Sequence, residues 1–509
     1  MAGPKWPVLT GQNRLRPSGM IVPRIPTLAA VLAALAPSGC GSGSDDTVSV
    51  AVIGQTGAAF NTGTRLPPAA QLVRSATAEG LVGLDEQGRA VPALADRWIV
   101  TDDGLSYIFR LRDGTWPDNT PITGDTAREA LLDAMNRAKA GPLGGDLAAV
   151  GEVRAMAGRV IEIRLRQQTP DMLQLLAQPE LGLLRRGRGA GPMRMTRDGD
   201  LAVLRAIAPE DRGLPEEPDW KGRIRRLELR TLPAGTAIDR FNTDDASVVL
   251  GGRFADFPLL DAKGVARGAV RLDPVNGLFG LAVMHDDGFL SKAENREALA
   301  MAVDRDALIG ALNVGGWTAT TRIVNPGLAG DTGSIGERWT GRTIEERRAM
   351  AAGRVAQWKS GAASPVVLRI ALPTGPGADV LFRRLSADFS AIGLTTRRVG
   401  ERDPADLRLV DAVARYASAS WFLNQLGCAR RLALCSLTAD GMVAAALDEA
   451  DPVRRADLYG DAEAQLTIAN GFIPFGVPIR WSLVAGKATG FATNPWNAHP
   501  LMPLALRPK

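Results

Sequence analysis

The sequence predicts an exported protein of the α/β class. Short runs in which β-branched residues alternate with polar ones predict strands, and longer segments with apolar residues at helical spacing alternate with them. An apolar segment near the amino terminus has the length and the flanking charge of an export signal. A chain of 509 residues has room for roughly two to four folding units.

The export signal is expected at residues 1–40, and Met20 is a more natural start than Met1. From Met20 to Cys40 the chain reads MIVPRIPTLAAVLAALAPSGC. Arg24 supplies a positive charge ahead of the apolar run Leu28–Ala36, which has the length of a signal-peptide core. The run is too short for a transmembrane helix, which needs about 20 apolar residues.

The signal ends in Ser38-Gly39-Cys40, followed by a flexible linker at 41–46. This end resembles the cleavage box of bacterial lipoproteins, in which the cysteine becomes the lipidated first residue. Pro37 stands where leucine is usual. The alternative is a soluble secreted form cut after Ala36, but Pro37 would then follow the cut directly, which disfavours that cleavage. We expect a lipid anchor on Cys40 and a location in the periplasm or cell envelope.

Four segments are expected to form strands, at 47–53, 105–112, 160–166 and 366–372. The first, TVSVAVI, is rich in β-branched residues that alternate along the run. The second alternates similarly, and the third carries polar residues on one face. The fourth is apolar over most of its length, which indicates a more buried position.

Three segments are expected to form helices, at 295–312, 378–392 and 453–466. In the second of these, Leu381, Leu385 and Phe389 recur at helical spacing. No internal repeat or coiled-coil heptad pattern is present in the sequence.

The composition excludes several classes of function. The chain has 60 basic and 55 acidic residues, and the two signs are interspersed. A nucleic-acid-binding protein would show clustered Lys and Arg, so no nucleic-acid partner is expected. His285 and His499 are the sole histidines, which makes a histidine-rich metal site implausible.

The chain has three cysteines. If Cys40 carries lipid, Cys428 and Cys435 remain as an even pair in an oxidising compartment, and we expect a disulfide between them. The ring is small, so its entropic stabilisation would be roughly 2–3 kcal/mol at most. The alternative is two buried free thiols.

Catalytic motifs are absent from the sequence after Cys40: it holds no Walker loop, HExxH, SxxK or nucleophile elbow. Gly189 and Gly191 follow an arginine-rich stretch at 185–188, and together these residues could form a loop that binds a phosphate. A solvated loop between domains is the plainer interpretation, and we favour it. No enzyme, cofactor or metal site is expected.

The segment from Glu79 to Asp125 carries three motifs in order. They are PALADRW at 92–98, DGLSYIFRLR at 103–112, and a turn at 116–126. The segment resembles the amino-terminal signature of the solute-binding proteins of peptide and nickel ABC importers, known as family 5. Asn119 replaces the glycine of the family's turn, and Thr126 stands where an acid is usual.

Later segments resemble the same family in the same order. They are NREALAMAVDRDALI at 295–309, GPMR at 191–194, the helix at 456–466, and Ile473-Pro474. Met193 stands where the family has tyrosine. The matches extend over about 400 residues.

The resemblance implies a periplasmic binding protein fold of type II with three lobes. Lobe I would comprise 47–82, 186–270 and the tail at 476–509; lobe II would be an insertion at 83–185, and lobe III would be 271–475. A solute would be enclosed between lobes I and III by hinge closure. The function implied is a monomeric extracytoplasmic receptor that delivers a peptide-like or other small solute to the permease subunits of an ABC importer. The alternative is an envelope protein of the same fold that acts as a sensor or interaction partner without transport.

The resemblance also points to Arg415, Tyr416 and Trp421 as candidate ligand-binding residues. Peptide-binding relatives carry an ADYxxPxxFLN pattern whose acidic residue pairs with the ligand's ammonium group. Here the chain reads ARYASASWFLN from Ala414, with Arg415 in place of that acid. A cation there would favour a neutral or anionic solute, or one with a blocked amine. The alternative is that Arg415 points to solvent or pairs with an acidic neighbour such as Asp411.

Phe279 is a further candidate. The segment LFGLAV at 278–283 resembles the strand that borders the cleft in relatives, where tyrosines are frequent. Phe279 and small or aliphatic residues there would make a roomier, less polar pocket. Plain core packing of Phe279 is an equal alternative.

Overall fold

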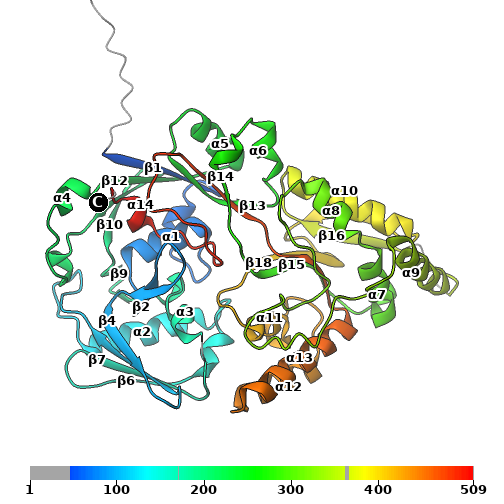
Figure 1. Ribbon diagram of the computed structural model, residues 1–509, viewed down its shortest axis with the longest axis horizontal. Coiled ribbons are helices and arrows are strands. Elements are labelled where there is room, and N and C mark those ends of the chain that lie inside the picture. The colour runs from blue at the N-terminus through cyan, green and yellow to red at the C-terminus, as the bar shows by residue number, and fades with distance from the viewer. Residues whose placement is uncertain (1–45, 170, 362–365, 508–509) are drawn as a thin grey trace, which may run out of the picture. The chain divides into compact units, whose positions relative to one another are not determined.

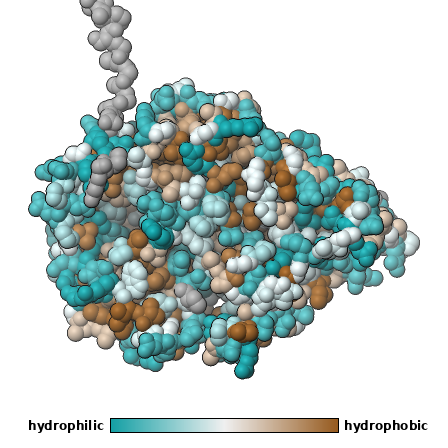
Figure 2. Space-filling view, viewed as in Figure 1, coloured by the Kyte–Doolittle hydropathy of each residue, from teal (hydrophilic) through white to brown (hydrophobic). Residues whose placement is uncertain are grey.

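Three β-sheets organise the protein, and the computed structural model describes residues 46–169, 171–361 and 366–507 (Figure 1). The expected signal peptide, Cys40 and residues 41–45 of the linker lie outside the described residues. Among the described residues, no helix has the length and apolar character needed to cross a membrane. The face shown in Figure 2 mixes hydrophilic and hydrophobic residues.

The first sheet has seven strands in the order β10-β11-β12-β1-β13-β20-β14. β1 pairs in parallel with β12 and β13, and the outer pairs are antiparallel. Both faces of β1 are covered: Val48, Val50 and Val52 pack towards α1, and Ala51 packs towards α5. The bounds are β1 Thr47–Ile53, β10 Met193–Asp198, β11 Leu201–Ala206, β12 Arg226–Leu232, β13 Val248–Arg253, β14 Val270–Leu272, β20 Arg480–Val484, α1 Pro68–Thr77 and α5 Ala234–Asn242.

The second sheet has five strands in the order β17-β16-β18-β15-β19. Every residue of β15 is buried, because β18 and β19 flank it and helices cover the sheet. The bounds are β15 Gly277–Val283, β16 Val367–Leu372, β17 Thr395–Gly400, β18 Leu407–Val413, β19 Phe472–Gly476, α7 Ala293–Ala302, α8 Arg305–Leu312, α9 Ile344–Lys359, α10 Pro376–Ala391, α11 Ala419–Leu426, α12 Leu437–Asp448 and α13 Pro452–Ala469.

The third sheet is antiparallel, with four strands in the order β4-β5-β7-β6. The helix α2 packs on one face of it, and its start is fixed by a capping box between Thr123 and Thr126. The bounds are β4 Ala95–Val100, β5 Ser106–Leu111, β6 Val150–Ala155, β7 Val160–Leu165 and α2 Gly124–Ala138; short elements include β2 Val82–Leu84, β3 Ala90–Pro92, β8 Leu184–Arg185, β9 Arg188–Gly189, α3 Met172–Leu176, α4 Trp220–Arg223, α6 Pro258–Ala262 and α14 Leu501–Leu504.

The four predicted strands are present as β1, β5, β7 and β16, and two predicted helices are present as α10 and α13. The single helix predicted over 295–312 is wrong, because the structure breaks it into α7 and α8. The side chain of Asp304 accepts a hydrogen bond from the backbone N–H of Ala307 and so starts a new helix.

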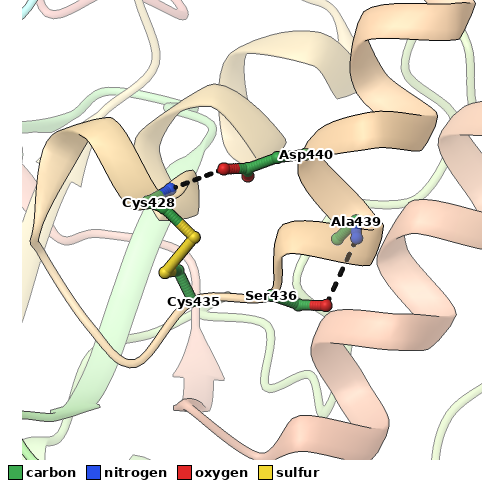
Figure 3. The surroundings of a disulfide bond; sticks show 5 residues. All are labelled: Cys428, Cys435, Ser436, Ala439 and Asp440. Carbon is green, nitrogen blue, oxygen red and sulfur yellow. Dashed lines mark hydrogen bonds between the residues drawn. A yellow bond between two sulfur atoms is a disulfide. The ribbon is translucent and has the colours of Figure 1, made fainter.

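The structure joins Cys428 and Cys435 by a disulfide, as Figure 3 shows. The bond closes the loop between α11 and α12. The Asp440 carboxylate accepts a hydrogen bond of 3.0 Å from the backbone N–H of Cys428, and the Ser436 hydroxyl caps α12 at Ala439 (Figure 3). The loop is therefore fastened to the helix that follows it by more than the disulfide.

Asp406 should make the protein less stable in acid. Burial alone would raise the pKa of its carboxyl group, but hydrogen bonds from Arg369 and His285 and the charge of Arg369 lower that pKa from 3.8 to about 2. A pKa that is lower in the folded state adds stability above about pH 4, and this stability is lost as the pH falls towards 2. We expect Asp406→Asn to lower the free energy of unfolding at pH 7 by about 1–2 kcal/mol, allowing for solvent screening.

The measurement is urea unfolding between pH 2 and pH 7. Asp287→Asn is the matched control, because Asp287 contacts the same histidine but its side chain is 85% exposed. The Asp406 variant and the wild type should converge as the pH approaches 2. A constant difference at every pH would contradict the prediction.

Candidate functional site

A cavity of about 720 Å³ opens between the seven-stranded sheet, the five-stranded sheet and the segments 78–93 and 177–182. One part of the wall comes from β1, α1, the end of β13 and the carboxyl-terminal segment 496–503. A second part comes from the segments 78–93 and 177–182, and a third from β18 and α11. This volume lies within the range of about 300–1,000 Å³ that is usual for sites that enclose drug-sized ligands. A second hollow, of about 640 Å³, lies beside β16, β17 and the start of α10. It is open and lies within one sheet region, so it cannot enclose a ligand.

Much of the cavity wall is apolar. The apolar side chains are those of Val52, Leu72, Val82, Leu84, Val91, Leu250, Val410, Val413, Trp421, Leu432, Trp496, Leu501 and Met502. Burial of apolar ligand surface contributes about 25 cal/mol per Å². The wall therefore favours a ligand with a substantial apolar part.

Arg253, Asp411 and Arg480 form an ion cluster at the cavity. Arg253 donates to Asp411 Oδ2 from Nε over 3.0 Å, and Arg480 Nη1 donates to Asp411 Oδ1 over 2.7 Å. Burial alone would raise the pKa of the Asp411 carboxyl group, but Arg253 and Arg480 outweigh it and lower the pKa. The carboxylate is therefore ionised at neutral pH, and the cluster carries one excess positive charge.

A second cluster lies between the first and third sheets, where Glu79 pairs with both Arg112 and Arg212. The Arg112 Nη2 to Glu79 Oε2 distance is 2.8 Å, and Arg112 also donates to the carbonyl of Ala190. Glu79 and Arg212 line the cavity. In this cluster, as in the first, one carboxylate pairs with two guanidinium groups.

Arg415 lines the cavity, and its acidic partner is not Asp411, the neighbour that we named. Its guanidinium donates to Gln178 Oε1 over 2.8 Å and to Glu180 Oε1 over 3.1 Å, whereas Asp411 pairs with the other arginines. Glu180 lies far back in the sequence, and its side chain is 7% exposed. The Arg415 charge is therefore balanced inside the protein, in line with the alternative that it pairs with an acidic group.

Tyr416 is buried and does not line the cavity. Its hydroxyl donates to Asp146 Oδ1 over 2.7 Å, and Asn424 donates to the same oxygen over 3.1 Å. Burial is the main cause that raises the pKa of Tyr416. Tyr416 therefore fastens the α11 region to residue 146, while Trp421, also buried, contributes to the cavity wall.

Phe279 lies in the core, which corrects its prediction as a pocket residue. It is 0% exposed and is not part of the cavity wall. Its ring packs against Phe254, Trp317 and Phe475 at centroid distances of 5.1, 5.9 and 5.8 Å. Its side chain belongs to the largest buried cluster, together with these three rings, which a pattern of six apolar residues could not reveal.

Gly189 and Gly191 are packed against the end of α1. A Cβ atom on Gly189 would lie 2.3 Å from the Cβ of Ala78, and one on Gly191 would lie 2.4 Å from the carbonyl carbon of Thr77. The stretch therefore needs glycine for close packing, and a phosphate has no room there.

The described residues hold no group of His, Cys, Asp and Glu side chains that could bind a metal ion. His285 contacts Asp406 and Asp287, and His499 contacts Asp273. Both histidines are thus engaged by nearby carboxylates.

Residues 89–397 match the sequence profile of a family described as bacterial extracellular solute-binding proteins, family 5. Among curated proteins, the chain is 33% identical over 122 residues to the "probable deoxycholate-binding periplasmic protein YgiS" of Escherichia coli K12. It is 28% identical over 118 residues to the glutathione-binding protein GsiB of E. coli. These alignments cover 20% and 22% of this chain and span 23% and 22% of the length of the two relatives.

Solved structures match over most of the chain. Haemophilus influenzae OppA in complex with the peptide RPPGFSPFR has a TM-score of 0.77 at 16% identity, covering 91% of this chain and 99% of that one. The E. coli murein tripeptide-binding protein MppA has a TM-score of 0.76 at 17% identity, with the same coverage. Campylobacter jejuni NikZ with Ni(L-His) has a TM-score of 0.70 at 16% identity, covering 88% of this chain and 96% of that one. The predicted periplasmic binding protein fold is thereby confirmed.

Proposed function

The chain belongs to the family 5 bacterial extracellular solute-binding proteins, and we propose that it is the receptor that delivers a drug-sized, neutral or anionic solute to an ABC importer. The observation that carries this proposal is the cavity of about 720 Å³, with apolar walls and ion clusters in which arginines outnumber carboxylates. The protein binds and releases its solute and performs no chemistry on it.

The three sheets support a division into lobes. We propose lobe I around the seven-stranded sheet (47–82, 186–270 and 476–509), lobe II around the four-stranded sheet (83–185), and lobe III around the five-stranded sheet (271–475). The solute lies between lobes I and III, and hinge closure encloses it. Permease subunits in the inner membrane then receive it from a monomeric receptor.

The charges of the cavity argue against a ligand held by a free ammonium group. Of the four carboxylates that line the cavity, Glu79, Asp85 and Asp411 already pair with arginines. Arg415 stands where peptide-binding relatives have an acid. A solute with an apolar body and a carboxylate suits this wall, and deoxycholate, which appears in the name of one relative, is a compound of that class.

Native mass spectrometry of the purified protein, followed by calorimetry, tests the proposal. The panel contains deoxycholate, N-acylated peptides, and the same peptides with free amines. We expect binding of the first two classes and weaker binding of the free-amine peptides. Tight binding of free-amine peptides that is lost on N-acylation would overturn the proposal.

We propose that the protein is attached to the cell envelope through Cys40. The motif Ser38-Gly39-Cys40 after an apolar run supports a diacylglyceryl group on Cys40 and a further acyl chain on its amino group. Two or more acyl chains make membrane attachment stable, whereas one gives marginal binding. Metabolic labelling with a clickable fatty acid should tag the wild type and fail to tag Cys40→Ala. Equal labelling of both proteins would refute the anchor.

A further inference from the structure

Arg253 differs from Arg212, Arg415 and Arg480 of the cavity wall in how much of its side chain is exposed. Its side chain is 43% exposed, against 23% for Arg415, 14% for Arg212 and 8% for Arg480. The Oδ2 atom of Asp411 contacts both Nε and Nη2 of Arg253, and the backbone carbonyl of Asp411 also accepts a hydrogen bond from Nη2. No partner of its Nη1 is found among the described residues. One edge of the guanidinium is thus fixed by the protein, and the other is available in the cavity.

The backbone beneath Arg253 is held firmly. Arg253 is the last residue of β13, and the indole N–H of Trp481 donates to its carbonyl over 2.9 Å. Gly252 lets that indole approach, because a Cβ atom there would lie 2.1 Å from the Trp481 ring. The guanidinium therefore projects from a rigid strand end and not from a loop.

The charge arrangement around Arg253 calls for an anion. Arg253 and Arg480 are direct partners across the antiparallel strands β13 and β20. Like charges directly opposite each other destabilise a sheet. Asp411, 3% exposed, offsets one of the two charges. Glu401 and Asp256 act on Arg253 at longer range, but no contact of either with its Nη1 is found among the described residues.

The cluster also joins two lobes. Arg253 and Arg480 belong to the seven-stranded sheet, and Asp411 belongs to β18 of the five-stranded sheet. A group bound to the free edge of Arg253 therefore lies where the two sheets that must close on the solute meet.

We propose that Arg253 is the residue that selects the anionic group of the solute, a carboxylate, and that Asp411 and Arg480 position its guanidinium. This inference rests on the proposed function and deepens it, since it names the group that is recognised and the residue that recognises it. The planar guanidinium meets a carboxylate through charge-assisted hydrogen bonds, while the apolar wall holds the rest of the solute.

The experiment compares the binding of deoxycholate and of its uncharged methyl ester by calorimetry, at concentrations below self-association. The variants are Arg253→Gln and Arg226→Gln. Arg226 lies on β12 of the same sheet, is 41% exposed, pairs with Glu228 and is not part of the cavity wall. We expect the wild type to bind the acid at least about tenfold more tightly than the ester, the range expected for a charge-assisted hydrogen bond. Arg253→Gln should lose this preference with little change for the ester, and Arg226→Gln should retain it.

Arg253→Lys keeps the charge without the planar fork and should restore part of the preference. Thermal unfolding of each variant checks that the fold is intact; if Arg253→Gln does not fold, the Lys variant must show a reduced preference. A preference for the acid that survives in a folded Arg253→Gln protein overturns this inference alone. A wild type that binds neither probe, or that prefers the ester, overturns the inference as well, and the free-amine panel then decides separately whether the proposed function stands.

Discussion

Replacing Glu463 with alanine should lower the free energy of unfolding by about 3–5 kcal/mol, the range for breaking a buried ion pair. Glu463 lies on α13, and its side chain is 2% exposed. Its carboxylate accepts from Arg322 Nη2 over 2.8 Å and from the backbone N–H groups of Ile323 and Val324, both over 3.1 Å. Alanine would leave these two donors unsatisfied in the interior, and Arg322 would retain Asp331 as its one carboxylate partner.

Denaturant unfolding at pH 7 measures the effect. Asp457→Ala is the matched control, an exposed acid on the same helix, and should change the free energy of unfolding by less than about 0.5 kcal/mol. Glu463→Gln retains an acceptor of the same shape and should fall between the two. Equal small effects for Glu463→Ala and Asp457→Ala would show that the buried carboxylate does not hold the segment 320–334 against α13.

Local patterns in the sequence were sufficient to predict four strands. β1, β5 and β7 show alternation, which depends only on which face of a strand is buried, and β16 shows the apolar run of a strand buried on both faces. The break between α7 and α8 escaped the same reasoning. Apolar residues keep their helical spacing across it, and an aspartate at 304 looks the same in sequence whether it caps a helix or lies on the surface. Only the hydrogen bond from Ala307 distinguishes the two cases.

The candidate site depends on contacts between distant parts of the chain. The Arg415 position could be predicted from the family pattern, but its partner Glu180 lies 235 residues away and gives no local signal. Arg253 and Asp411 are separated by 158 residues, and neither belongs to a recognisable motif. Charge pairing in a cleft between lobes follows from the packing of whole sheets, which residue spacing does not encode.

Replacing Phe279 with alanine should lower the free energy of unfolding by about 3–5 kcal/mol, the range for removing a buried aromatic ring. The ring is fully buried and lies among Phe254, Trp317 and Phe475, so its removal leaves a cavity and three lost edge-to-face contacts. Since Phe279 is not part of the cavity wall, the affinity for any probe that the wild type binds should stay within about twofold, a change of less than about 0.5 kcal/mol.

Thermal unfolding and calorimetry on the same samples separate core packing from ligand contact at this position. Phe279→Leu retains most of the volume and should be less destabilising, by about half. Trp421→Ala is the counterpart, because Trp421 is also buried, at 3% exposure, but lines the cavity. Trp421→Ala should lower both the free energy of unfolding and the affinity for the ligand, because it removes an aromatic ring from the core and from the cavity wall. A Phe279→Ala protein with near wild-type stability and altered ligand preference would contradict the core placement.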